Sequence, residues 1–210
     1  MKKITIVLSF LVFFALIGSG LFFRYLKKLD QFPLLQVKVI IPEGYTVKDI
    51  AEKFNRFDNF NKENFLKIAR EGYLFPDTYF LGGSENEKEI IEKMENNFKA
   101  KIGEIKKEIL TMASIIEKEA HDKEDRRIIS GILWKRLNDG MLLQVDVELD
   151  TYENKGLPPM PICNPGLDAV DAALNPVDSK YWYYLSDKNG VTHYAETFEK
   201  HKLNRVRYGI

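Results

Sequence analysis

Apolar positions recur with helical spacing through the middle of the chain, in residues 106–120 (KKEILTMASIIEKEA). Each residue of a helix turns about 100° from the last. Measured from Met112, Glu119 lies within roughly 20° of the centre of the apolar stripe, whereas Glu117 is turned away by roughly 140°. The pattern therefore predicts that Glu119 faces inward and that Glu117 belongs to the solvated flank. The stripe itself consists of Ile105, Ile109, Met112, Ile115 and Ile116.

An inward-facing carboxylate has a specific chemical use. Against an apolar surface and without a cationic partner, Glu119 is expected to have a raised pKa, which suits a general acid at neutral pH. Two other interpretations stay open. Glu119 lies at a helix end where the stripe has already reached solvent, or it pairs with Arg126 or Arg127. Ser114 falls on the opposite helix face, which disfavours a serine nucleophile acting beside Glu119.

Capping and turn signals divide the preceding part of the chain into short elements. Thr46 followed three residues later by Asp49 is typical of a helix N-cap, so a helix should run from there through Phe54. Ser84 is expected to cap a later helix over about residues 85–100. The predicted order is a strand at 36–41, the helix ending at Phe54, a helix at 62–70, an extended aromatic segment at 73–81 and the helix capped by Ser84.

The part that follows Glu119 is mainly helical. Helical spacing predicts a helix over residues 123–139, which Gly140 ends, and another over 167–174. Between them lies a connection rich in glycine and proline (156–166), which either lines a binding groove or only joins elements. Two strands, 181–186 and 192–194, flank the turn 187–190. The fold class expected is α+β: a small strand-helix-helix part, then a mainly helical domain with a carboxy-terminal β-hairpin.

The amino-terminal segment differs from all of this. Residues 4–23 (ITIVLSFLVFFALIGSGLFF) are uncharged and about long enough to cross a bilayer. A secretory signal peptide is the rival interpretation, but its apolar part should be shorter and end in a clear cleavage pattern, of which residues 18–20 are a faint version. We expect an uncleaved anchor, with the amino terminus inside and the chain from Asp30 onward outside.

Composition excludes several classes of function. Lys plus Arg equals Asp plus Glu at 31 each, so nothing supports binding to nucleic acid, which normally needs a basic excess or a basic face. The single cysteine, Cys163, excludes an internal disulfide and a cysteine-based metal cluster. His193 and His201 are too isolated for a zinc site. We therefore expect no metal and no organic cofactor.

Several short motifs stand in order along the chain: EGYLFPDTY at 71–79, ASIIEKE at 113–119, RLNDGMLLQVD at 136–146, GLPP at 156–159, NPG at 164–166 and NP at 175–176. Each motif alone is weak evidence for a family, and the ordered set is specific. Together they resemble the MltG (YceG-like) family of endolytic murein transglycosylases. They occur in the order of that family and cover about residues 37–206.

The resemblance implies a membrane-anchored lyase that acts on the glycan strands of peptidoglycan outside the bacterial plasma membrane, with peptidoglycan synthases as candidate partners. One glutamate would protonate the bond between N-acetylmuramic acid and N-acetylglucosamine and then help to close a 1,6-anhydro ring, where ordinary glycosidases use two carboxylates. That glutamate corresponds to Glu119. Residues expected to bind substrate or support the acid are Gln144, Asp146, Tyr152, Asn164 and Glu117.

The sequence also departs from the family pattern. The LysM-like region ahead of the catalytic part is reduced to a strand and two helices, and the excursion usual after Asp146 is shortened to residues 147–155, with Asp150 where the family has asparagine. The expected division is an anchor at 1–30, a LysM-like subdomain with the aromatic segment at 31–82, and a catalytic domain at 83–210. Two alternatives stay open: a noncatalytic glycan-binding scaffold, or an inverting hydrolase with Asp146 as its second carboxylate.

Overall fold

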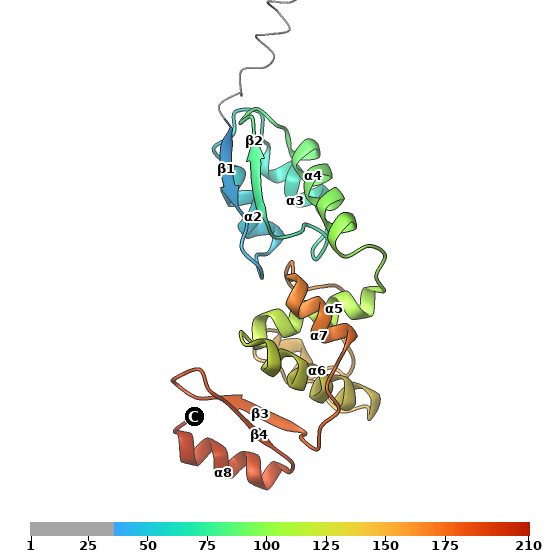
Figure 1. The fold of residues 1–210 in the computed structure, drawn as a ribbon, viewed down its shortest axis with the longest axis vertical. Coiled ribbons are helices and arrows are strands. Elements are labelled where there is room, and N and C mark those ends of the chain that lie inside the picture. Colours follow the sequence, from blue (N-terminus) through green and yellow to red (C-terminus); the bar gives the residue numbers. More distant parts are fainter. Residues whose placement is uncertain (1–35) are drawn as a thin grey trace, which may run out of the picture. The chain divides into compact units, whose positions relative to one another are not determined.

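The computed structural model describes residues 36–210, and residues 38–210 form one compact unit. The predicted anchor at 1–30 lies outside the described residues. Within the part that is described, no helix is both long and apolar enough to span a membrane. The α+β class is confirmed (Figure 1), with elements β1 (Val37–Ile40), α2 (Val47–Phe54), α3 (Lys62–Ile68), β2 (Thr78–Leu81), α4 (Glu87–Lys101), α5 (Lys107–Glu119), α6 (Lys123–Asn138), a 3-10 helix (Leu149–Tyr152), α7 (Leu167–Leu174), β3 (Tyr183–Ser186), β4 (Thr192–Ala195) and α8 (Phe198–Tyr208).

The first part of the fold gains a strand that the sequence pattern did not specify. The predicted extended segment contains β2, which pairs with β1 in a two-stranded sheet. The Ile41 amide donates to the Asp77 carbonyl oxygen at 2.9 Å, so the end of β1 meets the start of β2 and the strands are antiparallel. Helices α2 and α3 connect them. The predicted capping box at the start of α2 is confirmed, since Thr46 and Asp49 each bond the other's backbone amide.

The predicted start of α4 is wrong by two residues. Asn86, not Ser84, is the N-cap. Its side-chain oxygen accepts from the Lys88 and Glu89 amides at 3.0 and 3.2 Å, and the Glu89 carboxylate accepts from the Asn86 amide at 2.9 Å. An asparagine can close this reciprocal box as well as a serine can, so the true cap lies inside the predicted helix.

The core of the second part lies among α5, α6 and α7, and helix α5 contacts both of the others. The predicted apolar stripe of α5 is present, but burial extends far beyond it. Every residue from Leu110 to Glu117 is buried. A helix covered on nearly all sides has no solvated flank, so the prediction that Glu117 faces solvent is wrong.

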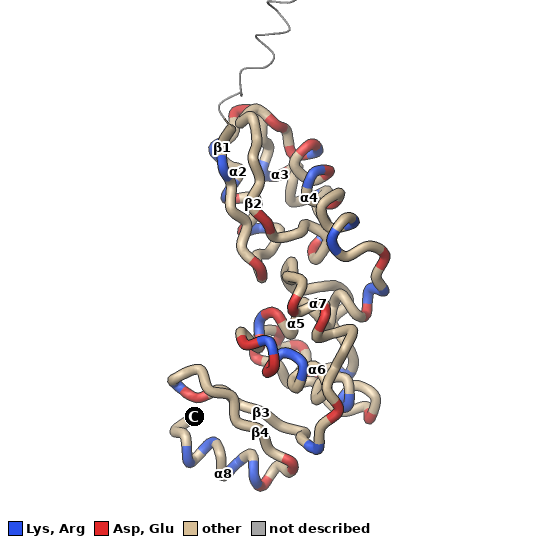
Figure 2. Tube along the Cα trace, viewed as in Figure 1, with Lys and Arg blue, Asp and Glu red and all other residues tan. Residues whose placement is uncertain are grey.

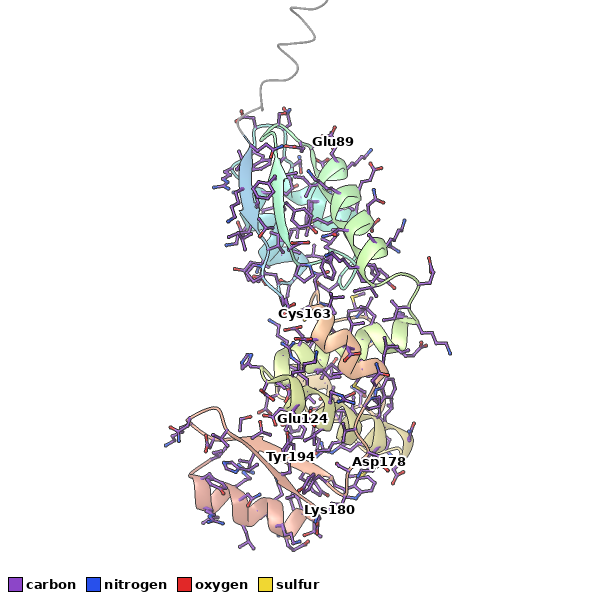
Figure 3. All side chains as sticks on the ribbon, viewed as in Figure 1. Glu89, Glu124, Cys163, Asp178, Lys180 and Tyr194 are labelled. Atoms are coloured by element: carbon purple, nitrogen blue, oxygen red, sulfur yellow. The ribbon has the colours of Figure 1, made fainter. Side chains whose placement is uncertain are left out.

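The carboxy-terminal hairpin is confirmed and carries an additional helix. Strands β3 and β4 pair antiparallel, with Tyr183 opposite Ala195, and α8 packs on both strands. Tyr194, labelled in Figure 3, points from β4 toward α6, where Asp125 accepts from its hydroxyl at 2.5 Å and from the Thr192 hydroxyl at 2.7 Å. The hairpin is therefore fixed to the α6 side of the core.

Candidate active site

Glu119 is the last residue of α5, where the apolar stripe leaves the core. Its half-buried side chain lines a cleft of about 600 Å³. Three of the residues predicted to support it lie in the same cleft: Gln144, Asp146 and Tyr152. The structure therefore brings together residues that come from a helix end, a loop and a 3-10 helix.

The immediate partner of Glu119 is Tyr184, which sequence reasoning did not single out. The Tyr184 hydroxyl, on β3, donates to Glu119 Oε2 at 2.9 Å. Burial raises the pKa of the Glu119 carboxyl above its ordinary value, and the charge of Asp146 raises it further; the Tyr184 hydrogen bond and the charge of Arg136 oppose this. Within residues 36–210, no lysine or arginine lies within ion-pair distance of Glu119. The site therefore favours the protonated form of this carboxyl more than an exposed position would, which is the property that a general acid requires.

Asp146 is oriented by the loop that carries it. The Tyr152 hydroxyl donates to Asp146 Oδ1, and this hydrogen bond is the main cause that raises the pKa of Tyr152 to about 12. Thr151 closes the loop, because its side-chain oxygen accepts from the Val145 amide at 3.0 Å and its carbonyl accepts from the Gln144 amide at 3.1 Å. Gln144 adopts a left-handed φ of 51°, which is uncommon outside glycine. The loop thus fixes the two residues on either side of buried Val145.

Arg136 ties together the segments that form the cleft. From α6, its Nε donates to the Trp182 carbonyl at 2.8 Å and its Nη1 donates to the Leu143 carbonyl at 2.6 Å. Its guanidinium also lies 5.1 Å from the centre of the Tyr183 ring. Because it is buried, Arg136 can hold the loop after α6 beside β3. Arg136 begins the motif at 136–146, but nothing in the sequence distinguished this buried arginine from a solvent-exposed one.

Helix α8 supplies a wall of the cleft that was not predicted. Basic residues recur along this helix (Figure 2). Burial lowers the pKa of His201, which favours its neutral form. The apolar residues of α8 are mostly exposed, so the helix gave no clear amphipathic signal. The α8 segment contributes Phe198, His201, Arg205 and Ile210 to the cleft.

Glu117, expected as a supporting residue, lies outside the cleft. Its carboxylate is buried against Arg126, whose Nη2 donates to Oε1 at 2.7 Å, while the Gly166 amide donates to Oε2 at 2.9 Å. Arg126 also donates from Nε to the carbonyl oxygen of Ala120 at 3.0 Å. The arginine that sequence reasoning considered for Glu119 therefore pairs with Glu117 and fixes the residue that follows Glu119.

Asn164 also lies outside the cleft, fully buried at a junction between distant segments. Its side-chain oxygen accepts from the Leu74 amide at 2.8 Å. Its side-chain nitrogen donates to the Tyr45 carbonyl at 2.9 Å and to Glu71 Oε1 at 2.7 Å. Every polar atom of this amide has a protein partner, so the geometry supports a structural role.

The structure gives no reactive environment to the cysteine and no metal-ligand cluster among residues 36–210. The Cys163 thiol (Figure 3) is buried, which raises its pKa to about 12, and its Sγ donates to the Ser114 carbonyl at 3.3 Å. No cluster of histidine, cysteine, aspartate and glutamate within residues 36–210 has the arrangement of a metal site. Glu119 is therefore the candidate on which the site is built.

Comparisons with known proteins identify the family of this chain. The sequence profile of the YceG-like family matches residues 22–150 and 148–207. The endolytic murein transglycosylase of Bacillus subtilis (strain 168) is 33% identical over 184 residues, which is 72% of this chain and 51% of that protein. The protein of the same name from Streptococcus pneumoniae serotype 2 is 32% identical over 181 residues, 68% of this chain and 33% of that protein.

This chain thus spans about half the length of the Bacillus relative and a third of the Streptococcus relative. A crystal structure of a YceG-like protein from Listeria monocytogenes has 30% sequence identity and a TM-score of 0.72, with coverage of 82% of this chain and 76% of that one. The profile match extends over most of the chain, including Glu119 and the cleft loop. The chain belongs to the YceG-like family.

Proposed function

We propose that this protein is a lytic transglycosylase that cleaves the bond between N-acetylmuramic acid and N-acetylglucosamine in peptidoglycan, with Glu119 as the catalytic acid. The observation that carries the proposal is the half-buried carboxyl in a cleft, with a raised pKa, a hydroxyl donor and, among residues 36–210, no cationic partner within ion-pair distance. The two relatives named endolytic murein transglycosylase support the same substrate and reaction class.

In the proposed reaction, Glu119 gives its proton to the glycosidic oxygen and the bond from that oxygen to C1 of the muramic acid breaks. The resulting carboxylate then takes the proton from the C6 hydroxyl of the same sugar, and O6 bonds to C1. No water is consumed, so the product carries a 1,6-anhydro end. Tyr184 donates to Oε2 of Glu119, so the proton that the acid delivers would stand on Oε1.

A muramidase-type inverting hydrolase is the second candidate, because Asp146 lines the same cleft. In such an enzyme a second carboxylate stands about 6.5–9.5 Å from the acid and activates a water between them. Under the lyase mechanism, Asp146 instead raises the pKa of Glu119 and binds substrate hydroxyls, while Tyr152 holds one of its oxygens. The two functions differ in their products.

The proposed cellular setting rests on the sequence. The uncharged run at residues 4–23 would tether the enzyme to the bacterial plasma membrane by a single span, with the cleft on the outer side. Nascent glycan strands are the proposed substrate, since a tethered enzyme meets them close to the membrane. Internal cleavage would then end the elongation of a strand, and peptidoglycan synthases are the proposed partners.

The test is digestion of purified, uncrosslinked glycan strands by the full 210-residue chain in detergent, with products resolved by mass spectrometry. We expect 1,6-anhydro ends, lighter by one water than reducing ends, and their loss in Glu119→Gln. Glu108→Gln is the matched control, because Glu108 is exposed at the other end of α5. Reducing ends would establish the hydrolase, and tight binding without any product would establish a scaffold.

A further inference from the structure

A second hollow, of about 850 Å³, adjoins the catalytic cleft and has no part in the proposed chemistry. Lys118 and Val147 line both hollows, so the two adjoin at these residues, next to Glu119. One wall is formed by residues 148–156 and the proline-rich segment 157–162. We call this hollow the proline groove. The family profile matches the chain in two pieces that overlap at residues 148–150, so the match is interrupted at the start of this wall.

The two hollows differ in the surfaces they offer. The catalytic cleft is lined by the rings of Tyr152, Tyr183, Tyr184 and Phe198. Aromatic rings combine a large apolar face with, in tyrosine, a polar tip, and the C–H faces of sugar rings pack against such faces. Among the described residues that line the proline groove, none is aromatic. The groove is thus poorly suited to a continuing row of sugar units.

The charged residues of the proline groove have both signs. Lys118 and Lys155 supply two ammonium groups. Glu148 and Asp150, on the wall that carries Lys155, supply two carboxylates, and Glu71 supplies a third. Between them lie apolar side chains, with Met160 59% exposed. A ligand that complements this surface has carboxylates, an ammonium or amide group and small apolar side chains within a few residues, which describes a short peptide.

We propose that the proline groove binds the stem peptide carried by the muramic acid unit that sits in the catalytic cleft. This inference rests on the proposed function. Each muramic acid bears a short peptide on the lactyl group at C3, and a sugar placed against Glu119 must direct that peptide away from the reacting bond. The groove opens at Lys118, the residue next to Glu119. The peptide carboxylates face Lys118 and Lys155, and its alanine methyl groups face the apolar floor.

The test compares two substrates of equal strand length: strands that keep their stem peptides and strands from which an amidase has removed them. Lys155→Glu reverses a charge in the groove without touching the catalytic cleft. It should raise KM about five- to tenfold for peptide-bearing strands, as expected for the loss and reversal of one partly exposed charge contact, and leave KM for stripped strands unchanged. Lys188→Glu, an exposed residue of the β3–β4 turn, is the matched control and should alter neither.

Equal KM values of the wild-type protein for the two substrates, or an equal effect of Lys155→Glu on both, would overturn the proposal; the second result would assign the groove to sugar units. Binding of both strands to full-length Glu119→Gln, measured without cleavage, separates this outcome from failure of the proposed function. A preference for peptide-bearing strands that disappears in Glu119→Gln/Lys155→Glu supports the groove even if no anhydro product forms. If the wild-type protein forms no anhydro product but Glu119→Gln still prefers peptide-bearing strands, the result would count against the proposed reaction and not against the groove.

Discussion

Replacing Arg126 by methionine should lower the free energy of unfolding by about 3–5 kcal/mol, because it removes one partner of a buried ion pair and leaves the other charged. Both side chains are almost fully buried, 7% and 6% exposed for Arg126 and Glu117. The variant leaves Glu117 with only the Gly166 amide, and it also frees the Ala120 carbonyl. For a chain of this size, each 1 kcal/mol shifts the midpoint of thermal unfolding by about 2–4 °C. The expected decrease is therefore about 6–20 °C.

The assay is thermal unfolding of the full chain at pH 7, followed by circular dichroism. Glu117→Gln/Arg126→Met should recover much of the loss, because glutamine keeps an acceptor for Gly166 and no buried charge remains unpaired. Arg127→Met is the matched control: Arg127 is half-buried on the same helix and makes no ion pair among the described residues. It should change stability by less than about 1 kcal/mol.

Arg126→Met should also reduce kcat when assayed well below its unfolding temperature, because Arg126 holds the carbonyl of the residue after Glu119. Two results would refute the reasoning. One is a loss of stability below about 1 kcal/mol, which would show that the pair is not effectively buried. The other is a double variant no more stable than Arg126→Met, which would show that the unpaired carboxylate of Glu117 is not the source of the cost.

Two further predictions concern the acid and the packing of α6. Activity should fall as pH rises through the pKa of Glu119, above its ordinary value of 4.5, because the acid works only when protonated. Tyr184→Phe removes a hydrogen bond that lowers the pKa of Glu119, so it should move the decline in kcat/KM to higher pH. Asp146→Asn removes a charge that raises this pKa, so it should move the decline to lower pH. Shifts of both variants in the same direction would refute the assignment of Glu119 as the acid. Gly131→Ala should destabilise the protein by about 1–3 kcal/mol in thermal unfolding, since a Cβ there would lie 1.9 Å from the Val177 carbonyl oxygen; a stability equal to wild type would show that this backbone yields easily.

Local signals were sufficient to predict several elements before the structure. The capping box at Thr46 and Asp49 uses residues three apart, and it fixed the start of α2 at the right position. Helix α7 has the predicted bounds, and the turn at 187–190 joins the predicted strands. These features depend on neighbours in sequence, so the sequence contains their cause.

The features that sequence reasoning missed depend on distant contacts. Asn164 was expected at the substrate, but its amide bonds Tyr45, 119 positions away. Nothing near Asn164 in the sequence indicates which backbone it satisfies. Sequence reasoning also missed helix α8, because its apolar residues do not mark a buried face: Leu203 is 68% exposed and Val206 is 83% exposed.

The position of Glu119 reconciles two interpretations that the sequence left as alternatives. Helical geometry placed it on the buried stripe, while its position near the helix end suggested exposure. Both are true, because α5 ends at Glu119 and the stripe passes from the core into the cleft at that residue. A core position would leave the carboxyl without substrate, and an open surface would leave its pKa near the ordinary value. Only the boundary between them raises the pKa of the carboxyl and still leaves it at a cleft, and Tyr184 and Asp146 shift that pKa in opposite directions from elements far away in the sequence.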